Sequence, residues 1–194
     1  MPLDLMTDQS DEDLLAAYAS GNQAAAQALT LRHAGRVFAH AMRLLGDRAE
    51  AEDVAQDAML KLWRIAPDWR SGEAQVSTWL YRVTANMCID RIRKRRTTNF
   101  DDLPEMADDS ASVIETMEQK ERHEALQDAL DQLPDRQKQA VVLRHIDGLS
   151  NPEIGQIMDI TPRAVESLTA RGKRALTALL SRKREELGYD HAGE

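Results

Sequence analysis

Two helix starts that lie close together near the carboxyl end of the chain constrain its fold most strongly. In Ser150-Asn151-Pro152-Glu153 a serine can cap, a proline suits the first turn and a glutamate completes a capping box. Thr161-Pro162 repeats the pairing of a capping side chain with a proline. The spacing predicts a short helix over 151–158, a tight turn and a longer helix over 162–187, which together form a helix-turn-helix.

The longer of these helices has two chemically different sides. At about 100° per residue, Val165, Leu168 and Gly172 fall on one side with further apolar residues. The other side carries hydroxyl and guanidinium groups, on Arg163, Ser167, Arg171 and Arg174. These groups suit the base edges and phosphates of a DNA major groove. A solvated amphipathic helix explains the periodicity equally well, but the paired caps favour DNA binding.

The rest of the chain also has the pattern of a helical protein. Aromatic residues make up only 4% of the sequence, which argues against a strand-rich fold. We expect helices over 11–20, 23–45, 48–66 and 75–96 before a connector, and over 113–132, 135–147, 151–158 and 162–187 after it. The predicted fold class is therefore all-α, with two small helical domains joined by a flexible linker.

Charge marks the division between these domains. The net charge is −8, yet residues 27–96 hold thirteen Lys and Arg against eight Asp and Glu, whereas residues 97–135 hold two against twelve. A basic block that ends at Arg91 to Arg96 is thus followed by an acidic segment. We place the first domain at 1–96, an acidic linker at 97–125, the second domain at 126–187 and a tail at 188–194.

Several functional classes receive no support. The chain begins with the acidic stretch MPLDLMTDQSDED and has no run of eighteen apolar residues, so we expect a cytoplasmic protein with no membrane insertion. Cys88 is the only cysteine and the five histidines are scattered, so we expect no metal and no cofactor. No metalloprotease motif, phosphate-binding glycine loop or nucleophile–base pair is found, so we expect no enzyme and no small-molecule substrate.

The helix over 48–66 offers a candidate protein-binding face. Ala51, Val54, Ala58 and further apolar residues share a broad side that should be buried. The opposite side combines carboxylates, an amide and a leucine, on Asp53, Gln56, Asp57 and Leu60. This combination suits a basic partner protein, although a solvated face with one stray leucine is the plainer interpretation.

The helix over 75–96 offers a candidate surface for single-stranded nucleic acid. Trp79, Arg82, Asn86 and Arg93 fall within roughly a 60° sector. An aromatic ring can stack on bases, an amide can bond to base edges and guanidinium groups bind phosphate. The alternative is that Trp79 belongs to the core and that the basic end of the helix complements the helix dipole.

Together these segments resemble the extracytoplasmic-function (ECF) sigma factors of bacterial RNA polymerase over nearly the whole chain. AEAEDVAQDAMLKLWR (Ala49 to Arg64) is similar to the core-polymerase-binding helix, and STWLYRVTANMCIDRIRKRR (Ser77 to Arg96) to the minus-ten promoter helix. LDQLPDRQKQAVVLRHIDGLSNPEIGQIM (Leu130 to Met158), followed by TPRAVESLTARGKRAL (Thr161 to Leu176), is similar to the minus-thirty-five-binding domain. The resemblance implies a sigma factor that directs polymerase to particular promoters.

The resemblance also implies a role for each candidate residue. The contacts to the clamp helices of core RNA polymerase would be Asp53, Gln56, Asp57 and Leu60. The contacts to minus-ten promoter DNA would be Arg82, Arg91, Arg93 and Arg95 on the strand, with the loop over 67–72 and Asn86 at a flipped base. Trp79 is added to this minus-ten set from its place in the same sector of the helix. The contacts to the minus-thirty-five duplex would be Arg163, Ser167, Arg171 and Arg174.

Two positions depart from the family pattern. Glu166 and Leu168 stand where many members carry basic residues, and a glutamate can accept a hydrogen bond from cytosine. We therefore expect Glu166 to help specify the minus-thirty-five sequence. PRAVESLTARGKRAL is also similar to alphaproteobacterial sigma-E type members that answer oxidative or singlet-oxygen stress.

The family further implies an anti-sigma factor that holds the protein inactive, in some members zinc-containing or membrane-linked. Two other functional classes stay open. A sigma mimic would sequester an anti-sigma factor without binding DNA, yet reading residues such as Asn86 and Arg171 are present. A plain helix-turn-helix regulator would account for the second domain alone.

Overall fold

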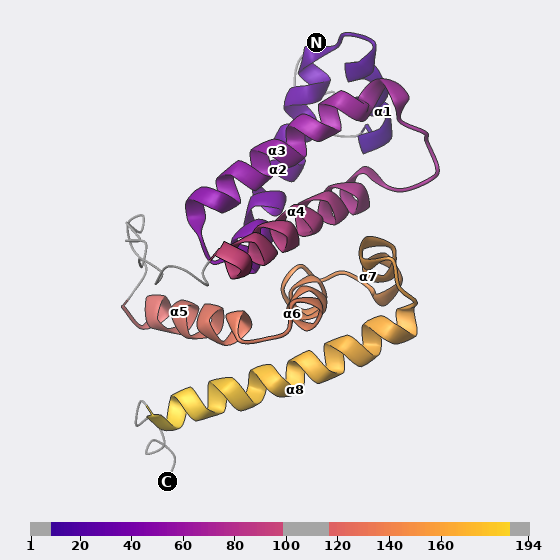
Figure 1. The fold of residues 1–194 in the computed structure, drawn as a ribbon. Helices are drawn as coiled ribbons and strands as arrows, with labels where there is room; N and C mark the ends of the chain where they lie inside the picture. The colour runs from indigo at the N-terminus through magenta and orange to yellow at the C-terminus, as the bar shows by residue number, and fades with distance from the viewer. Residues whose placement is uncertain (1–8, 99–116, 187–194) are drawn as a thin grey trace. The chain divides into compact units, whose positions relative to one another are not determined.

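The computed structural model of the chain describes residues 9–98 and 117–186. Within these ranges the regular elements are helices and no strand occurs. Contacts between Cα atoms divide the chain into two compact units, whose helices are labelled in Figure 1. The prediction of an all-α protein with two helical domains is therefore confirmed.

The first unit contains α1 (Asp11–Ala19), α2 (Gln23–Leu45), α3 (Arg48–Ile65), the short 3₁₀ helix η2 (Ala66–Asp68) and α4 (Val76–Thr98) up to Arg93. The side chains of Ser10, Asn22 and Asp47 each accept a hydrogen bond from a backbone N–H in the first turn of a helix, at 3.1, 3.1 and 2.8 Å. The helices predicted over 11–20, 23–45 and 48–66 therefore begin where they were expected, and each start is capped.

A leucine-rich core holds the first unit together. Helix α2 packs against α1 and α3, and α4 adds residues to the same core. Leu14, Leu15, Leu29, Leu62 and Leu80 are each at most 1% exposed. Truncation of a buried leucine to alanine typically costs about 2–5 kcal/mol, so these side chains fix how the helices pack. The apolar side predicted for α3 lies in this core.

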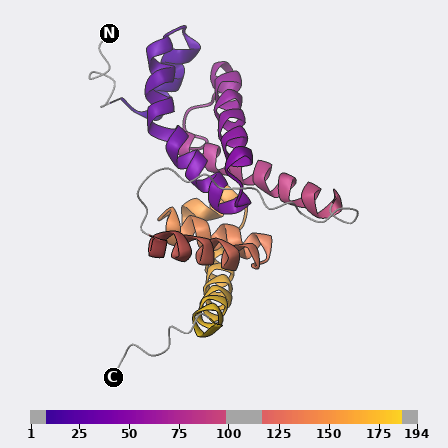
Figure 2. The same cartoon turned by 90° about the vertical axis from the view of Figure 1, so that its left-hand side faces the viewer.

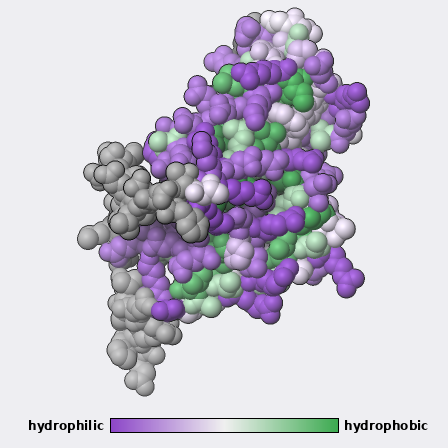
Figure 3. Space-filling view, in the orientation of Figure 1, coloured by the Kyte–Doolittle hydropathy of each residue, from purple (hydrophilic) through white to green (hydrophobic). Residues whose placement is uncertain are grey.

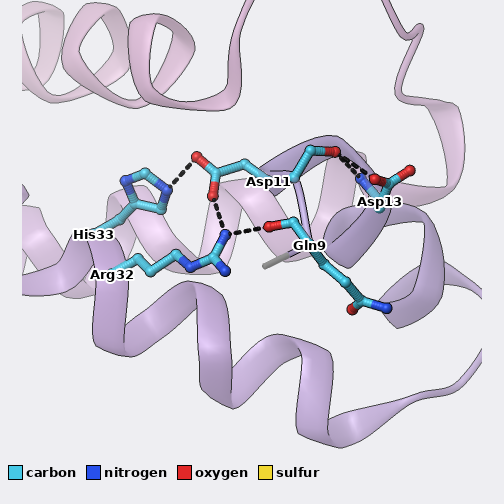
Figure 4. Close-up of polar contacts among 6 residues, drawn as sticks. Gln9, Asp11, Asp13, Arg32 and His33 are labelled. Atoms are coloured by element: carbon cyan, nitrogen blue, oxygen red, sulfur yellow. Dashed lines mark hydrogen bonds and ion pairs between the residues drawn. The ribbon is translucent and has the colours of Figure 1, made fainter. Parts of the chain in front are cut away.

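A partly buried polar contact ties α1 to α2, as Figure 4 shows. The Asp11 carboxylate accepts a hydrogen bond from Nη1 of Arg32 at 2.9 Å and lies 2.7 Å from Nε2 of His33. Arg32 also donates to the backbone carbonyl of Gln9 at 2.8 Å. Because a buried imidazole without a partner is costly, these bonds hold the first turn of α1 on α2.

The remaining helices are α5 (Met117–Asp131), α6 (Asp135–Val141), the π-helical turn η3 (Val142–Ile146), α7 (Asn151–Met158) and α8 (Pro162–Glu186), most of which belong to the second unit. Helix α8 packs along α5 and α6; Figure 1 shows its full length, whereas Figure 2 views it nearly along its axis. We expected one regular helix over 135–147, but the N–H of Asp147 donates to the carbonyl of Val142, five residues back.

Helices α6 and α8 approach closely at Gly172. A Cβ atom at this position would lie 2.6 Å from Cγ2 of Val141 and 3.1 Å from the carbonyl oxygen of Gln137. Val165 is fully buried on the same side of α8. The predicted inward side of this helix is therefore correct, and glycine is what allows the two backbones to approach.

The structure describes the predicted linker only in part. Residues 99–116 lie outside the described ranges, and α5 begins at Met117 within the range 97–125 that we assigned to the linker. The helix that we expected over 113–132 is present over Met117–Asp131, and residues 113–116 lie outside the described ranges. The boundaries of the two domains otherwise stay predictions.

Candidate nucleic-acid and protein interfaces

The turn between α7 and α8 is built by the capping residues that predicted it. The N–H of Ser150 donates to Oε2 of Glu153 at 2.7 Å, which closes the capping box of α7. Asp159 ends α7 in the left-handed conformation, with φ at 54°. Oγ1 of Thr161 accepts a hydrogen bond from the N–H of Ala164 at 3.2 Å and starts α8. The two predicted helices and the turn between them are confirmed.

The negative charge of Glu153 suits the first turn of α7. Hydrogen bonds from the side chain and the backbone of Ser150 lower the pKa of the Glu153 carboxyl. The glutamate is therefore ionised more readily than usual at the positive end of the helix dipole.

Gly155 makes the turn tight. A Cβ atom here would lie 2.8 Å from the carbonyl oxygen of Ile160, whose own N–H donates to the carbonyl of Gly155 at 3.0 Å. Any larger residue would push the turn away from α7. This role was not predicted from the sequence, although a glycine inside a predicted helix is a signal of close packing.

The candidate residues on α8 lie together on its exposed side, and they are Arg163, Glu166, Ser167, Arg171 and Arg174. Nε of Arg171 donates to the backbone carbonyl of Ser167 at 3.3 Å, so its guanidinium lies along the helix. We call these five residues the α8 stripe. They can meet base edges and phosphates together because one helix face presents them all.

Further cations lie near α8 in the second unit. Burial lowers the pKa of His145, and the charges of Lys173 and Arg144 lower it further. Lys173 belongs to α8 but not to the α8 stripe, and Arg144 belongs to η3. The helical phase of α8 alone could not reveal this positive region, because it combines residues from two elements.

The candidate residues on α3 share one exposed face. We call it the α3 face, and its residues are Asp53, Gln56, Asp57 and Leu60. Leu60 is 43% exposed, and only Leu31 also stands out as an exposed large apolar residue in the described part of the chain. Carboxylates around an exposed leucine are suited to a partner that offers basic and apolar groups.

An apolar groove between α2 and α3 extends the α3 face. Its volume is about 480 Å³, and its lining includes Phe38, Met59, Leu60 and Trp63. The groove was not predicted from the sequence, because helical phase shows which side of one helix is apolar but not the space left between two packed helices. The view in Figure 3 shows hydrophobic patches set among hydrophilic residues.

Three candidate residues lie along one exposed line of α4, and they are Arg82, Asn86 and Arg93. The fourth member of the predicted sector, Trp79, is half-buried and packs against the core. Its ring lies edge-on to Trp69, with ring centroids 6.1 Å apart. Trp79 therefore serves the core at least in part, and its contact with DNA stays a prediction.

Arg91 lies on a different side of α4 from this line. At about 100° per residue it is roughly 150° away from Asn86 and Arg93, and Arg95 lies near it. Both Arg91 and Arg95 are half-buried rather than exposed. Their assignment to minus-ten DNA therefore rests on the family resemblance and not on a shared surface with Asn86.

Arg91 instead meets helix α3. Its Nη1 donates to the backbone carbonyl of Glu50 at 3.3 Å and lies 3.8 Å from Oδ2 of Asp53. Its Nη2 lies 3.9 Å from Oδ2 of Asp57. The structure thus brings a predicted DNA contact together with two residues of the α3 face.

Two negative findings hold for the residues that the structure describes. No group of three or more His, Cys, Asp and Glu side chains is arranged to hold a metal ion. No helix there is long and apolar enough to cross a membrane.

Both halves of the chain match known families. Residues 29–98 match Sigma-70 region 2, and residues 123–176 match Sigma-70, region 4. The first match contains the α3 face and the candidate residues of α4. The second contains α7, the turn and the α8 stripe.

Relatives cover most of the chain. It is 34% identical over 176 residues to ECF RNA polymerase sigma factor SigM of Mycobacterium tuberculosis, a match that covers 89% of this chain and 86% of that protein. It is also 34% identical over 176 residues to ECF RNA polymerase sigma factor SigE of Mycolicibacterium smegmatis, covering 87% of this chain and 67% of that protein.

The fold of this chain is also similar to that of a solved structure. The structure of CnrH in complex with the cytosolic domain of CnrY gives a TM-score of 0.68 at 28% identity, and covers 90% of this chain and 99% of that one. CnrH of Cupriavidus metallidurans is an RNA polymerase sigma factor.

Proposed function

The chain belongs to the ECF sigma factors of RNA polymerase, and we propose from this that it binds core polymerase and directs initiation at a particular set of promoters. One observation carries the proposal: a single chain contains both the region 2 match, with its exposed α3 and α4 residues, and the region 4 match, with its helix-turn-helix. The function is binding without catalysis, in the cytoplasm.

Core polymerase binds the α3 face in this proposal. The exposed carboxylates of Asp53 and Asp57 attract a basic partner, and complementary charge mainly speeds and orients the encounter. Leu60 and the neighbouring apolar groove supply the area that an interface buries at its centre.

The exposed line of α4 takes the minus-ten strand. Asn86 bonds to the edge of an unpaired base, while Arg82 and Arg93 bind the adjacent phosphates. Trp79 contributes from its half-buried position next to this line, and Arg95 contributes from another side of α4.

The α8 stripe enters the major groove of the minus-thirty-five duplex. Its arginines supply phosphate contacts and bonds to guanine, and Ser167 supplies a hydroxyl. Glu166 accepts a hydrogen bond from a cytosine amino group and so sets the preference at one base pair.

An anti-sigma factor regulates the protein. The structure of CnrH in complex with the cytosolic domain of CnrY supports this part of the proposal, because it contains a relative of this chain bound to a second protein. We extend the proposal to an oxidative or singlet-oxygen signal and to a partner that is membrane-linked or carries its own zinc.

In vitro transcription tests the proposed function. The purified protein is mixed with bacterial core polymerase and genomic promoter fragments, and transcript starts are mapped. New starts that share one minus-thirty-five and one minus-ten sequence are expected. A double variant, Asn86→Ala with Arg171→Ala, should still bind core polymerase but lose these starts.

The other functional classes give different results. A sigma mimic would bind core polymerase or an anti-sigma factor without producing any start. A plain helix-turn-helix regulator would bind duplex DNA and leave core polymerase unbound.

A further inference from the structure

The position of Arg91 carries an inference about how the α3 face works. We propose that Arg91 is a positioning residue for the polymerase-binding carboxylates of α3 and not a contact of the minus-ten strand. The inference rests on the proposed function, because it takes the α3 face as the surface that meets core polymerase.

The side chain of Arg91 is anchored before any partner arrives. It is 29% exposed, and its Nη1 donates to the carbonyl of Glu50 at 3.3 Å. A guanidinium is a planar fork with five N–H donors, so one bond to a backbone carbonyl still leaves donors for other acceptors. The bond to the carbonyl of Glu50 therefore holds the guanidinium group of Arg91 against α3.

Two carboxylates of the α3 face meet this charge. Asp53 and Asp57 are one helical turn apart, and like charges at that spacing repel each other. Oδ2 of Asp53 lies 3.8 Å from Nη1 of Arg91 and Oδ2 of Asp57 lies 3.9 Å from Nη2, while the two aspartates are 70% and 54% exposed. A guanidinium between them offsets their repulsion and narrows the set of conformations that each carboxylate adopts.

This arrangement favours binding through preorganisation. Side chains that are ordered before association lose less entropy when the interface forms. The distances exceed those of good hydrogen bonds and the aspartates are exposed, so the effect on affinity is modest.

The same contacts work against a role at DNA. A phosphate at Arg91 would meet the negative charges of Asp53 and Asp57 beside it. The exposed line of α4 lies roughly 150° around the helix, so a strand bound there would have to leave it to reach Arg91.

Binding measurements on matched variants test the proposal. Affinity for core polymerase is measured without DNA for the full-length chain, for Arg91→Gln, for Arg91→Lys and for the pair Asp53→Asn with Asp57→Asn. Arg91→Gln is also combined with that pair. Arg36→Gln serves as the control, because it removes an exposed arginine from the same unit.

We expect Arg91→Gln to weaken core binding about two- to fivefold, as for other exposed charge pairs. Arg91→Lys, which keeps the positive charge, weakens core binding less than Arg91→Gln does. Arg36→Gln leaves core binding unchanged. In the background that lacks both carboxylates, Arg91→Gln has no further effect, because no charge is left for it to position.

Three outcomes would overturn the proposal, and each has a different meaning. If Arg91→Gln binds core normally but its holoenzyme binds a single-stranded minus-ten oligonucleotide more weakly, Arg91 is a strand contact. If Arg91→Gln weakens core binding equally in both backgrounds, it acts through the fold. If the aspartate pair itself leaves core binding unchanged, the α3 face is not the polymerase surface and the proposed function fails at that point.

Discussion

Gly172 and Gly35 lie inside two long helices but have opposite surroundings. A Cβ at Gly172 would lie 2.6 Å from Cγ2 of Val141, whereas a Cβ at Gly35 would meet open space. We predict that Gly172→Ala lowers the free energy of unfolding by about 1–3 kcal/mol through overpacking. Gly35→Ala should raise it by about 0.5–1 kcal/mol, because alanine favours the helix.

Urea unfolding followed by circular dichroism measures both changes. The two variants are matched controls for each other, since each adds one methyl group to a helix interior. An unchanged unfolding midpoint for Gly172→Ala would show that α6 and α8 do not approach as closely as described.

Glu153 gives the stability of the second unit a dependence on pH. Its pKa is lowered in the folded chain by the hydrogen bonds from Ser150, so its stabilising effect is present above the ordinary pKa of 4.5 and lost as the pH falls through the lower folded value. We predict that Glu153→Gln costs about 0.3–1 kcal/mol at neutral pH, and that the difference disappears in acid. Thermal unfolding of both proteins across this pH range is the measurement, and a difference that persists in acid contradicts the assignment.

At the scale of single residues, the sequence predicted which side chains are buried better than it predicted which side chains contact each other. Ala51, Val54 and Ala58 were assigned to the core from helical phase, and all three are buried. The partners of Arg91 could not be predicted, because they depend on how α4 crosses α3. The roles of Gly155 and Gly172 depend in the same way on backbones that meet only in three dimensions.

Among the helices, α8 allows the sharpest test of promoter preference. Glu166 belongs to the α8 stripe, and its side chain is exposed and does not pack in the core. We predict that Glu166→Ala leaves the fold stable and reduces discrimination at one base pair of the minus-thirty-five element by about 1–3 kcal/mol. Binding of the holoenzyme to a set of promoters with each minus-thirty-five base changed measures this effect.

Thr177→Ala is the control for that experiment, because Thr177 is exposed on α8 outside the α8 stripe. Unchanged base preference in Glu166→Ala would remove the glutamate from the specificity contacts.

Element boundaries followed from capping chemistry more reliably than from composition. Ser150 and Thr161 each precede a helix as predicted. The π-helical turn η3 was not predicted, because Val142 to Ile146 contain no proline or glycine to mark a change of hydrogen bonding. Helix α5 was expected over 113–132, and the described part of the chain shows it over Met117–Asp131.

For the whole molecule, the sequence predicts an effect of the acidic connector on DNA binding. Asp101, Asp102, Asp108 and Asp109 lie outside the described ranges, but their charges belong to a chain with a net charge of −8. We predict that changing all four to asparagine raises the affinity of the free protein for promoter DNA several-fold at low salt. The gain should shrink at high salt, because the interaction is electrostatic.

Fluorescence anisotropy with labelled promoter duplex, repeated over a salt series, measures this change. Equal affinities of the variant and the parent protein at low salt would show that the connector does not oppose DNA binding.

The helix-turn-helix contains two kinds of position, which differ in the substitutions that they tolerate. At Gly155 the neighbouring carbonyl of Ile160 leaves room for one amino acid only, so selection on the fold excludes other variants. The α8 stripe projects into solvent, so a substitution there leaves the packing of the helix intact. If the stripe reads the minus-thirty-five element as proposed, a lineage carrying this protein can acquire a new regulon through nucleotide changes in these five codons while the architecture stays constant.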